Sequence, residues 1–340
     1  MSESSKTGWP PAGIVKNFAK REGCIAGICD ATPLPREDNR FTPFVSRNIL
    51  KRTDPAANLP GVKSIIVVGV ESKIDAFPPM PEDAGIISVL GAAKDYHVTV
   101  KALLKRLTVD LEQHASFTYK ILVDSPTLDE RALAVRAGLG FLGRNGLVIS
   151  PEYGSRFNIG VLLTDIPWDS LTSGCYKTRQ LRSVEERSDE AIQKYVAFAG
   201  FMDCFANARN DGGNEFCNGL PSPCSTCRRC VDACPTGALS DTEGFNAALC
   251  ISYLTQKDDL TPEEAALMGR HLYGCDICQD VCPFNRPQPT PWAMPEDWLV
   301  MSDDEFDKTY GHTAMLWRGA ELLRRNAKAI IDSQQKYCKR

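Results

Sequence analysis

Residues 224–235 read CSTCRRCVDACP and residues 275–283 read CDICQDVCP, and these two cysteine runs decide the fold of the later part of this 340-residue chain. Cysteines at two-residue spacings, with a last cysteine followed by proline, are typical of proteins that hold two [4Fe–4S] clusters. Zinc sites usually have separated CxxC pairs, so structural zinc fits this spacing poorly. The two runs therefore predict a ferredoxin-like domain that transfers electrons.

The two runs supply seven thiolates, and Cys250 is the candidate for the eighth. In double-cluster folds the last cysteine of each run ligates the cluster of the other run. The remaining ligand is expected three residues before Cys275, where Leu272 stands instead, and Cys250 is the only cysteine between the runs. The expected ligand sets are Cys224, Cys227, Cys230 and Cys282 for one cluster, and Cys234, Cys250, Cys275 and Cys278 for the other.

Composition narrows the class of protein. The 14 cysteines would suggest disulfides in a secreted chain, but the N-terminus lacks the charged and apolar regions of a signal peptide. No apolar run reaches about 18 residues, so we expect no membrane span. A net charge of −4 gives no overall attraction to nucleic acid. We therefore expect a cytoplasmic iron–sulphur protein.

The first 165 residues predict a mixed α/β (α+β) fold. Apolar runs at 24–29, 62–70, 117–123 and 157–165 are typical of strands, with another short run at 86–90. Helical periodicity is clearest over 94–114 and weaker over 12–22 and 130–137. We expect a catalytic domain at 1–165, an insertion or linker at 166–220, the double-cluster domain at 221–286, and a proline-rich connection with a short helical tail at 287–340.

Asp124 is a candidate general acid because it ends an apolar strand just before Ser125-Pro126. Burial at such a position would raise the pKa of the carboxyl and suit it to donate a proton. An aspartate before a turn also commonly shapes that turn, and this alternative stays open.

Two further motifs are less specific. The loop AGLGFLG contains Gly138, Gly140 and Gly143, but it follows a helix, whereas the dinucleotide fingerprint follows a strand. These glycines either permit close approach to a bulky group or form an ordinary helix cap and turn. The KDYH stretch at 94–97 opens the strongest helix, where capping and packing are the alternative to a functional role.

The last 23 residues carry seven basic and two acidic side chains. A basic helix of this kind, including Arg324, Arg325 and Lys328, either contacts phosphates or is a solvated terminal helix.

Taken together, these motifs resemble the epoxyqueuosine reductases, a family of cobalamin-dependent iron–sulphur enzymes that complete the tRNA nucleoside queuosine. The matching stretches cover about residues 15–165 and 222–330, and they include residues 94–97 (KDYH), 123–124 (VD), 130–131 (ER), 137–143 (AGLGFLG), 154–157 (GSRF), 224–238, 250–255 (CISYLT), 273–286 and 323–327 (LRRNA). The segment from 166 to 223 is longer than the family's usual link.

The resemblance implies an N-terminal cobalamin-binding domain related to that of reductive dehalogenases, with Asp124 as proton donor. Electrons would pass from a low-potential donor such as flavodoxin or ferredoxin through two [4Fe–4S] clusters to cobalamin, and tRNA would be the substrate. We expect a monomer with no membrane partner. The residues expected to contact the corrinoid are Lys94, Tyr96, His97, Gly138, Gly140, Gly143, Ser155, Arg156 and Phe157.

Two other functions stay open at this point. A corrinoid and iron–sulphur reductase of the same fold could act on a small molecule and remove halide or oxygen. An electron-transfer protein without a substrate of its own would need only the cluster domain, so the Asp124 strand end and the glycine-rich loop argue against it.

Overall fold

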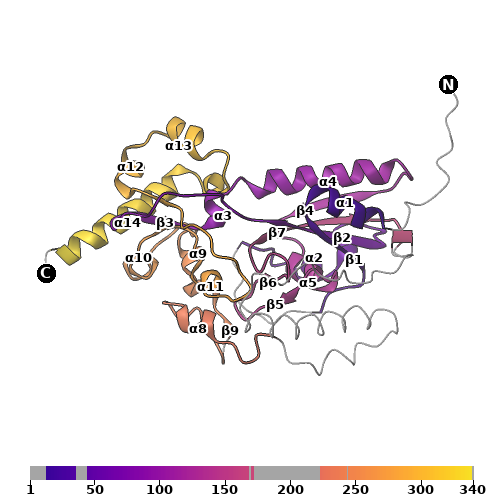
Figure 1. The fold of residues 1–340 in the computed structure, drawn as a ribbon, viewed down its shortest axis with the longest axis horizontal. Coiled ribbons are helices and arrows are strands. Elements are labelled where there is room, and N and C mark those ends of the chain that lie inside the picture. The colour runs from indigo at the N-terminus through magenta and orange to yellow at the C-terminus, as the bar shows by residue number, and fades with distance from the viewer. Residues whose placement is uncertain (1–12, 36–43, 168–169, 172–222, 243, 339–340) are drawn as a thin grey trace. The chain divides into compact units, whose positions relative to one another are not determined.

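The computed structural model describes residues 13–35, 44–167, 170–171, 223–242 and 244–338 (Figure 1). The chain forms two compact units, and each takes its residues from separate parts of the sequence. The described residues of the first unit are 13–35, 44–71, 100–167, 170–171 and 223–228, and those of the second are 72–99, 229–242 and 244–338. By its contacts, segment 72–99 thus belongs with the later part of the chain. The domain bounds expected from the sequence stay a prediction, and most of the expected insertion lies outside the described residues.

A four-stranded antiparallel sheet with the order β1-β2-β7-β4 forms the centre of the first unit (Figure 1). The two inner strands read as continuous apolar runs because both faces of the sheet are covered. Ile65, Ile66, Val67 and Val68 are all fully buried, although successive side chains point to opposite faces. The four strands are β1 (Ile25–Asp30), β2 (Ser64–Glu71), β4 (Tyr119–Val123) and β7 (Phe157–Thr164).

Helices lie on both faces of this sheet. On one face, α4 packs so closely that a Cβ atom on Gly160 of β7 would collide with Val100 and Leu104. On the other face, Leu133 and Ala134 of α5 join Ile65 and Val67 in one core cluster. The remaining elements of this unit are α1 (Ile14–Glu22), α2 (Ile49–Thr53), η1 (Pro55–Ala57), α4 (Tyr96–Glu112, whose first four residues belong to the second unit), α5 (Glu130–Arg136), β5 (Phe141–Leu142) and β6 (Val148–Ile149).

The second unit contains a three-stranded sheet, β10-β3-β11, in which β3 is central. β3 pairs in parallel with β10 and antiparallel with β11. The elements of this unit are β3 (Gly85–Ile87), α3 (Val89–Ala92), α8 (Arg229–Ala233), β8 (Leu239–Ser240), β9 (Gly244–Phe245), η2 (Ala247–Leu249), α9 (Ile251–Leu254), α10 (Pro262–Met268), β10 (His271–Tyr273), α11 (Ile277–Asp280), β11 (Trp292–Ala293), α12 (Pro295–Val300), α13 (Asp303–Tyr310), η3 (Ala314–Arg318) and α14 (Ala320–Cys338).

The core of the second unit is aromatic. The rings of Trp298 and Phe306 meet edge to face with centroids 5.7 Å apart, and Tyr310 completes the group. Leu323 and Ile330 on one side of α14 belong to the same buried cluster. Within the described ranges, no helix has the length and apolarity that a bilayer span requires.

The four longer strands of the first unit and helices α1, α4 and α5 confirm the elements expected from the sequence. The expected strand at 86–90 is wrong in its second half. Ser88 ends the strand because its hydroxyl accepts a hydrogen bond from the Gly91 N–H and caps α3.

Candidate iron–sulphur centre and proton-donor turn

Several of the predicted cluster thiols lie close enough to affect one another's pKa. Burial raises the pKa of the Cys275 thiol to about 12, and the neighbouring thiols of Cys250 and Cys234 raise it further. Burial likewise raises the pKa of Cys278, with contributions from Cys275, Cys250 and Cys230. Because Cys230 belongs to the first predicted set, the assignment of each cysteine to one cluster stays a prediction.

The local structure explains this convergence. Helix α8, which ends just before Cys234, packs against α11, which contains Cys278. Cys250 is the N-cap residue just before α9, and Cys275 lies two residues beyond β10. Within the described ranges, no three His, Cys, Asp or Glu side chains are grouped as the ligands of a single metal ion would be. A cubane, in contrast, is ligated by four separate thiolates.

The position expected for a cysteine three residues before Cys275 holds a core leucine. Leu272 is fully buried in β10, and a Cβ atom on Gly85 of the paired strand β3 would collide with its side chain. The tight packing of these two strands thus requires an apolar residue at position 272, and Cys250 stays the predicted ligand.

A buried amide connects the Cys250 helix to the strand that leads to Cys275. The Asn326 Nδ2 group on α14 donates hydrogen bonds to the carbonyl oxygens of Thr255 (2.8 Å) and Leu272 (2.9 Å). Asn326 is completely buried. Thr255 directly follows α9, and Leu272 belongs to β10, so this side chain fixes the spacing between two elements that carry cluster ligands. The sequence analysis did not identify this residue.

The first ligand set is divided between the two units. Cys224 and Cys227 lie in the first unit, where the Cys227 N–H donates to the Cys224 carbonyl, and Cys230 and Cys282 lie in the second. One guanidinium nitrogen of Arg144, in the loop between β5 and β6, donates to the carbonyl oxygens of both Cys224 and Ser225 at 3.1 Å. Arg144 therefore holds the loop that begins this predicted ligand run, and no motif in the sequence identifies this residue.

Asp124 is the first residue after β4 and has a left-handed backbone with φ of +50°. Asp124 is exposed, so the expectation that this residue is buried is wrong. The desolvated acid of this turn is the partly buried Glu130, because burial raises the pKa of its carboxyl to about 8. The Glu130 carboxyl accepts the N–H groups of Asp124 (3.0 Å) and Ser125 (2.8 Å).

The glycine-rich loop is explained largely by its own packing. Gly138 has a left-handed backbone (φ +78°) just after α5, as expected for a helix cap. A Cβ atom on Gly140 would lie 2.2 Å from the Ile149 carbonyl oxygen, and one on Gly143 would collide with the Ile149 side chain. These glycines let the β5–β6 hairpin close, so a corrinoid contact for any of the three stays a prediction.

Polar groups near this hairpin are buried. Ser155 and Arg156 are 7% and 6% exposed at the start of β7, and Phe157 beside them is partly buried. Asn145 is also buried, and its Nδ2 group makes no hydrogen bond within the described residues. A buried amide donor of this kind fits a ligand that carries carbonyl acceptors.

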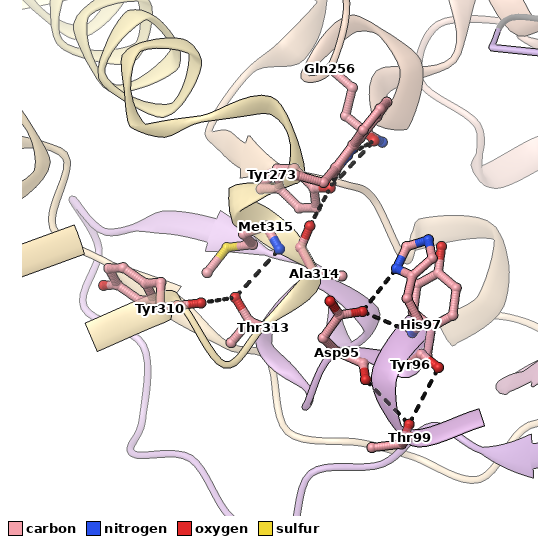
Figure 2. A network of polar contacts seen from close by, with 11 residues as sticks. Asp95, Tyr96, His97, Thr99, Gln256, Tyr273, Tyr310, Thr313, Ala314 and Met315 are labelled. Atoms are coloured by element: carbon pink, nitrogen blue, oxygen red, sulfur yellow. Dashed lines mark hydrogen bonds and ion pairs between the residues drawn. The ribbon is translucent and has the colours of Figure 1, made fainter. Parts of the chain in front are cut away.

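The KDYH stretch is held by hydrogen bonds within the second unit, as Figure 2 shows. The Asp95 carboxylate accepts the His97 backbone N–H and lies 2.8 Å from His97 Nδ1, and the rings of Tyr96 and His97 are stacked. Lys94 is exposed, and its backbone forms an isolated antiparallel β-bridge with Thr313. Asp95 therefore caps the start of α4, as one of the two alternatives expected. A corrinoid contact for Lys94, Tyr96 and His97 stays a prediction.

The two tail arginines are engaged inside the second unit. Arg324 donates to the Met301 carbonyl and pairs with Asp303, and Arg325 donates to the carbonyl oxygens of Lys257 and Asp258. Their donors bind protein oxygens, so Arg324 and Arg325 differ from both the free phosphate contact and the solvated helix expected from the sequence.

Two family models match the chain. Residues 52–125 match "Epoxyqueuosine reductase QueG, DUF1730", and residues 223–285 match a 4Fe-4S double cluster binding domain. The chain is 32% identical to an epoxyqueuosine reductase of Staphylococcus aureus over 303 residues, which cover 84% of this chain and 67% of that protein.

Solved structures agree with these matches. A crystal structure of an epoxyqueuosine reductase with an epoxyqueuosine-modified tRNA-Tyr stem loop is 28% identical and superposes with a TM-score of 0.69. An epoxyqueuosine reductase from Bacillus subtilis, with its aspartate-bearing catalytic loop swung out of the active site, is 27% identical and also has a TM-score of 0.69. Each alignment covers 93% of this chain and 80% of the other.

Proposed function

Because the chain belongs to the epoxyqueuosine reductase family, we propose that it reduces epoxyqueuosine to queuosine in tRNA. The observation that carries this proposal is the 32% identity to an enzyme of that name, which extends over 84% of the chain. The relative solved with a modified tRNA stem loop supports tRNA as the substrate.

The cysteine runs supply the electron carriers of this reaction. Eight half-buried thiols fit the ligand demand of two cubanes, and the cysteine spacing supports Cys234, Cys250, Cys275 and Cys278 as one set. Cys224, Cys227, Cys230 and Cys282 are proposed as the other. Ligation requires thiolates, so protons leave these groups when a cluster binds.

The hairpin fits the cobalamin that the family uses. The amide-bearing corrin ring of cobalamin would offer carbonyl acceptors to the buried Asn145 amide. Ser155, Arg156 and Phe157 are proposed to contact the ring. Cobalamin, when bound, supplies a reducing cobalt centre that receives the electrons from the clusters. The role of the protein here is to bind the group and to exclude water from it.

Asp124 is proposed to supply the proton. Converting an epoxide to an alkene takes two electrons and two protons and releases water, so a donor must protonate the departing oxygen. Asp124 directly follows a strand, its carboxyl is exposed, and the hydrogen bonds to Glu130 fix its backbone. A carboxyl on a fixed turn can reach a bound substrate while exchanging protons with solvent.

The oligomeric state, the compartment and the electron donor are also proposals. We expect a monomer in the cytoplasm that receives electrons from flavodoxin or ferredoxin, since tRNA modification and low-potential carriers occur together there.

Nucleoside analysis of tRNA tests the proposal. A strain that lacks the gene should accumulate epoxyqueuosine, and expression of the wild-type chain should restore queuosine. A variant with Cys250→Ser should restore little, because it lacks one cluster ligand. Normal queuosine levels in the deletion strain would contradict the proposal and favour a small-molecule substrate.

A further inference from the structure

The Glu130 side chain holds the backbone of the Asp124 turn from outside the turn. Asp124 is one of only two non-glycine residues in the described ranges with positive φ. A left-handed backbone is uncommon for residues other than glycine, although aspartate tolerates it better than most. The N–H groups of Asp124 and Ser125 point to the two different oxygens of the Glu130 carboxyl, at 3.0 and 2.8 Å. Two successive backbone N–H groups thus share one carboxyl, each bound to its own oxygen.

The Glu130 carboxyl is itself fixed in position. Glu130 is the first residue of α5, and the Asp129 side chain caps this helix by accepting the N–H groups of Arg131 and Ala132. Leu133 and Ala134 anchor the same helix in the core beneath the sheet. Because the helix cannot shift without disturbing this core, the carboxyl offers the turn a rigid attachment point.

We propose that Glu130 is the positioning residue of this site: its carboxyl holds the Asp124 turn in the conformation from which Asp124 donates a proton. Ser125 and Thr127 hydrogen-bond to each other within the turn. Those contacts shape the turn locally, and the Ser46 N–H donates to the Pro126 carbonyl. The Glu130 carboxyl connects the Asp124 N–H to the helix. The inference rests on the proposed function for its catalytic consequence, but the hold on the turn itself can be measured without substrate.

The test uses Glu130→Gln with a matched control. Glutamine keeps the shape of the side chain, but its NH2 group would face one of the two N–H donors instead of accepting from it. Glu305→Gln is the control, because Glu305 accepts a backbone N–H at the start of α13 in the same way but lies in the other unit.

Amide hydrogen exchange measures directly how firmly Glu130 holds the turn. In Glu130→Gln, the amides of Asp124 and Ser125 should exchange at least tenfold faster than in the wild type, while amides of β2 and β7 stay protected. Glu305→Gln should leave this turn unchanged. Wild-type exchange at both amides in Glu130→Gln would overturn the proposal, and so would faster exchange throughout the sheet, since that would make Glu130 a general stabiliser of the unit.

Kinetics then test the catalytic consequence. Glu130→Gln should lower kcat tenfold or more and leave KM within about twofold, because the turn is misplaced while substrate contacts remain. The double variant with Asp124→Asn should be no slower than Asp124→Asn alone, since Glu130 acts through Asp124. Multiplicative losses in the double variant would overturn the positioning role. Wild-type protein that is inactive on epoxyqueuosine tRNA would refute the proposed function, whereas the exchange experiment would still decide whether Glu130 holds the turn.

Discussion

Replacing Asn326 with leucine should destabilise the second unit and release one cluster. The Asn326 amide donates to two carbonyl oxygens, and its Oδ1 accepts from the Arg325 guanidinium at 2.7 Å. Leucine has nearly the same volume but no polar atom, so the substitution leaves three groups without this partner and creates little new cavity.

The expected cost follows from those three groups. A buried polar group that loses its partner costs about 1–3 kcal/mol, and the Arg325 group keeps other acceptors. The loss should therefore be about 3–5 kcal/mol, a large share of the roughly 5–15 kcal/mol that stabilises a domain. Because the two carbonyls belong to Thr255 and Leu272, the loosened elements are those next to Cys250 and Cys275.

Anaerobic urea unfolding and iron analysis provide the measurement. Asn326→Leu should unfold at lower urea and should retain about four of the about eight irons that two cubanes contain. Lys328→Gln is the control on the same helix: Lys328 is exposed and, within the described part of the chain, pairs with Asp332 alone, so its loss should cost at most about 0.5 kcal/mol. An Asn326→Leu protein with full iron content and wild-type urea stability would refute the reasoning.

Four further predictions test other parts of the molecule. Cys250→Ser should lower the iron content from about eight to about four per chain, and a full complement of iron would show that another group ligates the second cluster. Asp124→Asn should slow turnover by about 100- to 10,000-fold with clusters and cobalamin still bound, and a fully active variant would leave Asp124 as a turn residue. Neutral replacement of Arg324 and Arg325 should lower the melting temperature and leave the salt dependence of tRNA binding unchanged; a stable variant with a flatter salt dependence would restore the phosphate role. Burial raises the pKa of Glu130 to about 8, so between about pH 4.5 and pH 8 the folded state binds a proton that the unfolded state lacks, and this contribution to the free energy of unfolding falls as the pH rises. Stability–pH profiles of the wild type and Glu130→Gln should show a flatter slope for the variant in that window, and parallel profiles would contradict the buried-acid assignment.

The double-cluster domain could be predicted from the sequence because cluster ligation imposes fixed spacings, whereas the assignment of ligands to each cluster stays a prediction. The missing cysteine before Cys275 and the lone Cys250 could be recognised by counting alone. Apolar runs likewise predicted β2 and β7, since strands buried on both faces need them.

The rest depended on contacts between distant residues. Nothing in the local sequence shows that the Asn326 amide bridges two backbone carbonyls, or that Arg144 holds the Cys224 loop. The same limit applies to the turn at Asp124. A strand end predicted a buried acid, but burial fell on Glu130, six residues later, and left Asp124 exposed.

The central position of β3 has a consequence for synthesis on the ribosome. Its partners are β10 and β11, whose residues follow it by roughly 180 or more positions in the chain. At a translation rate of about 5–20 residues per second, the backbone groups of β3 wait on the order of ten seconds or longer for their hydrogen-bonding partners. During that interval the first unit can acquire its own strands β4 and β7, while Gly85–Ile87 stays an unpaired apolar segment. A nascent chain stalled before residue 271 should therefore recruit chaperones through the β3 segment. Cluster insertion must wait until the ribosome has translated residues beyond 271.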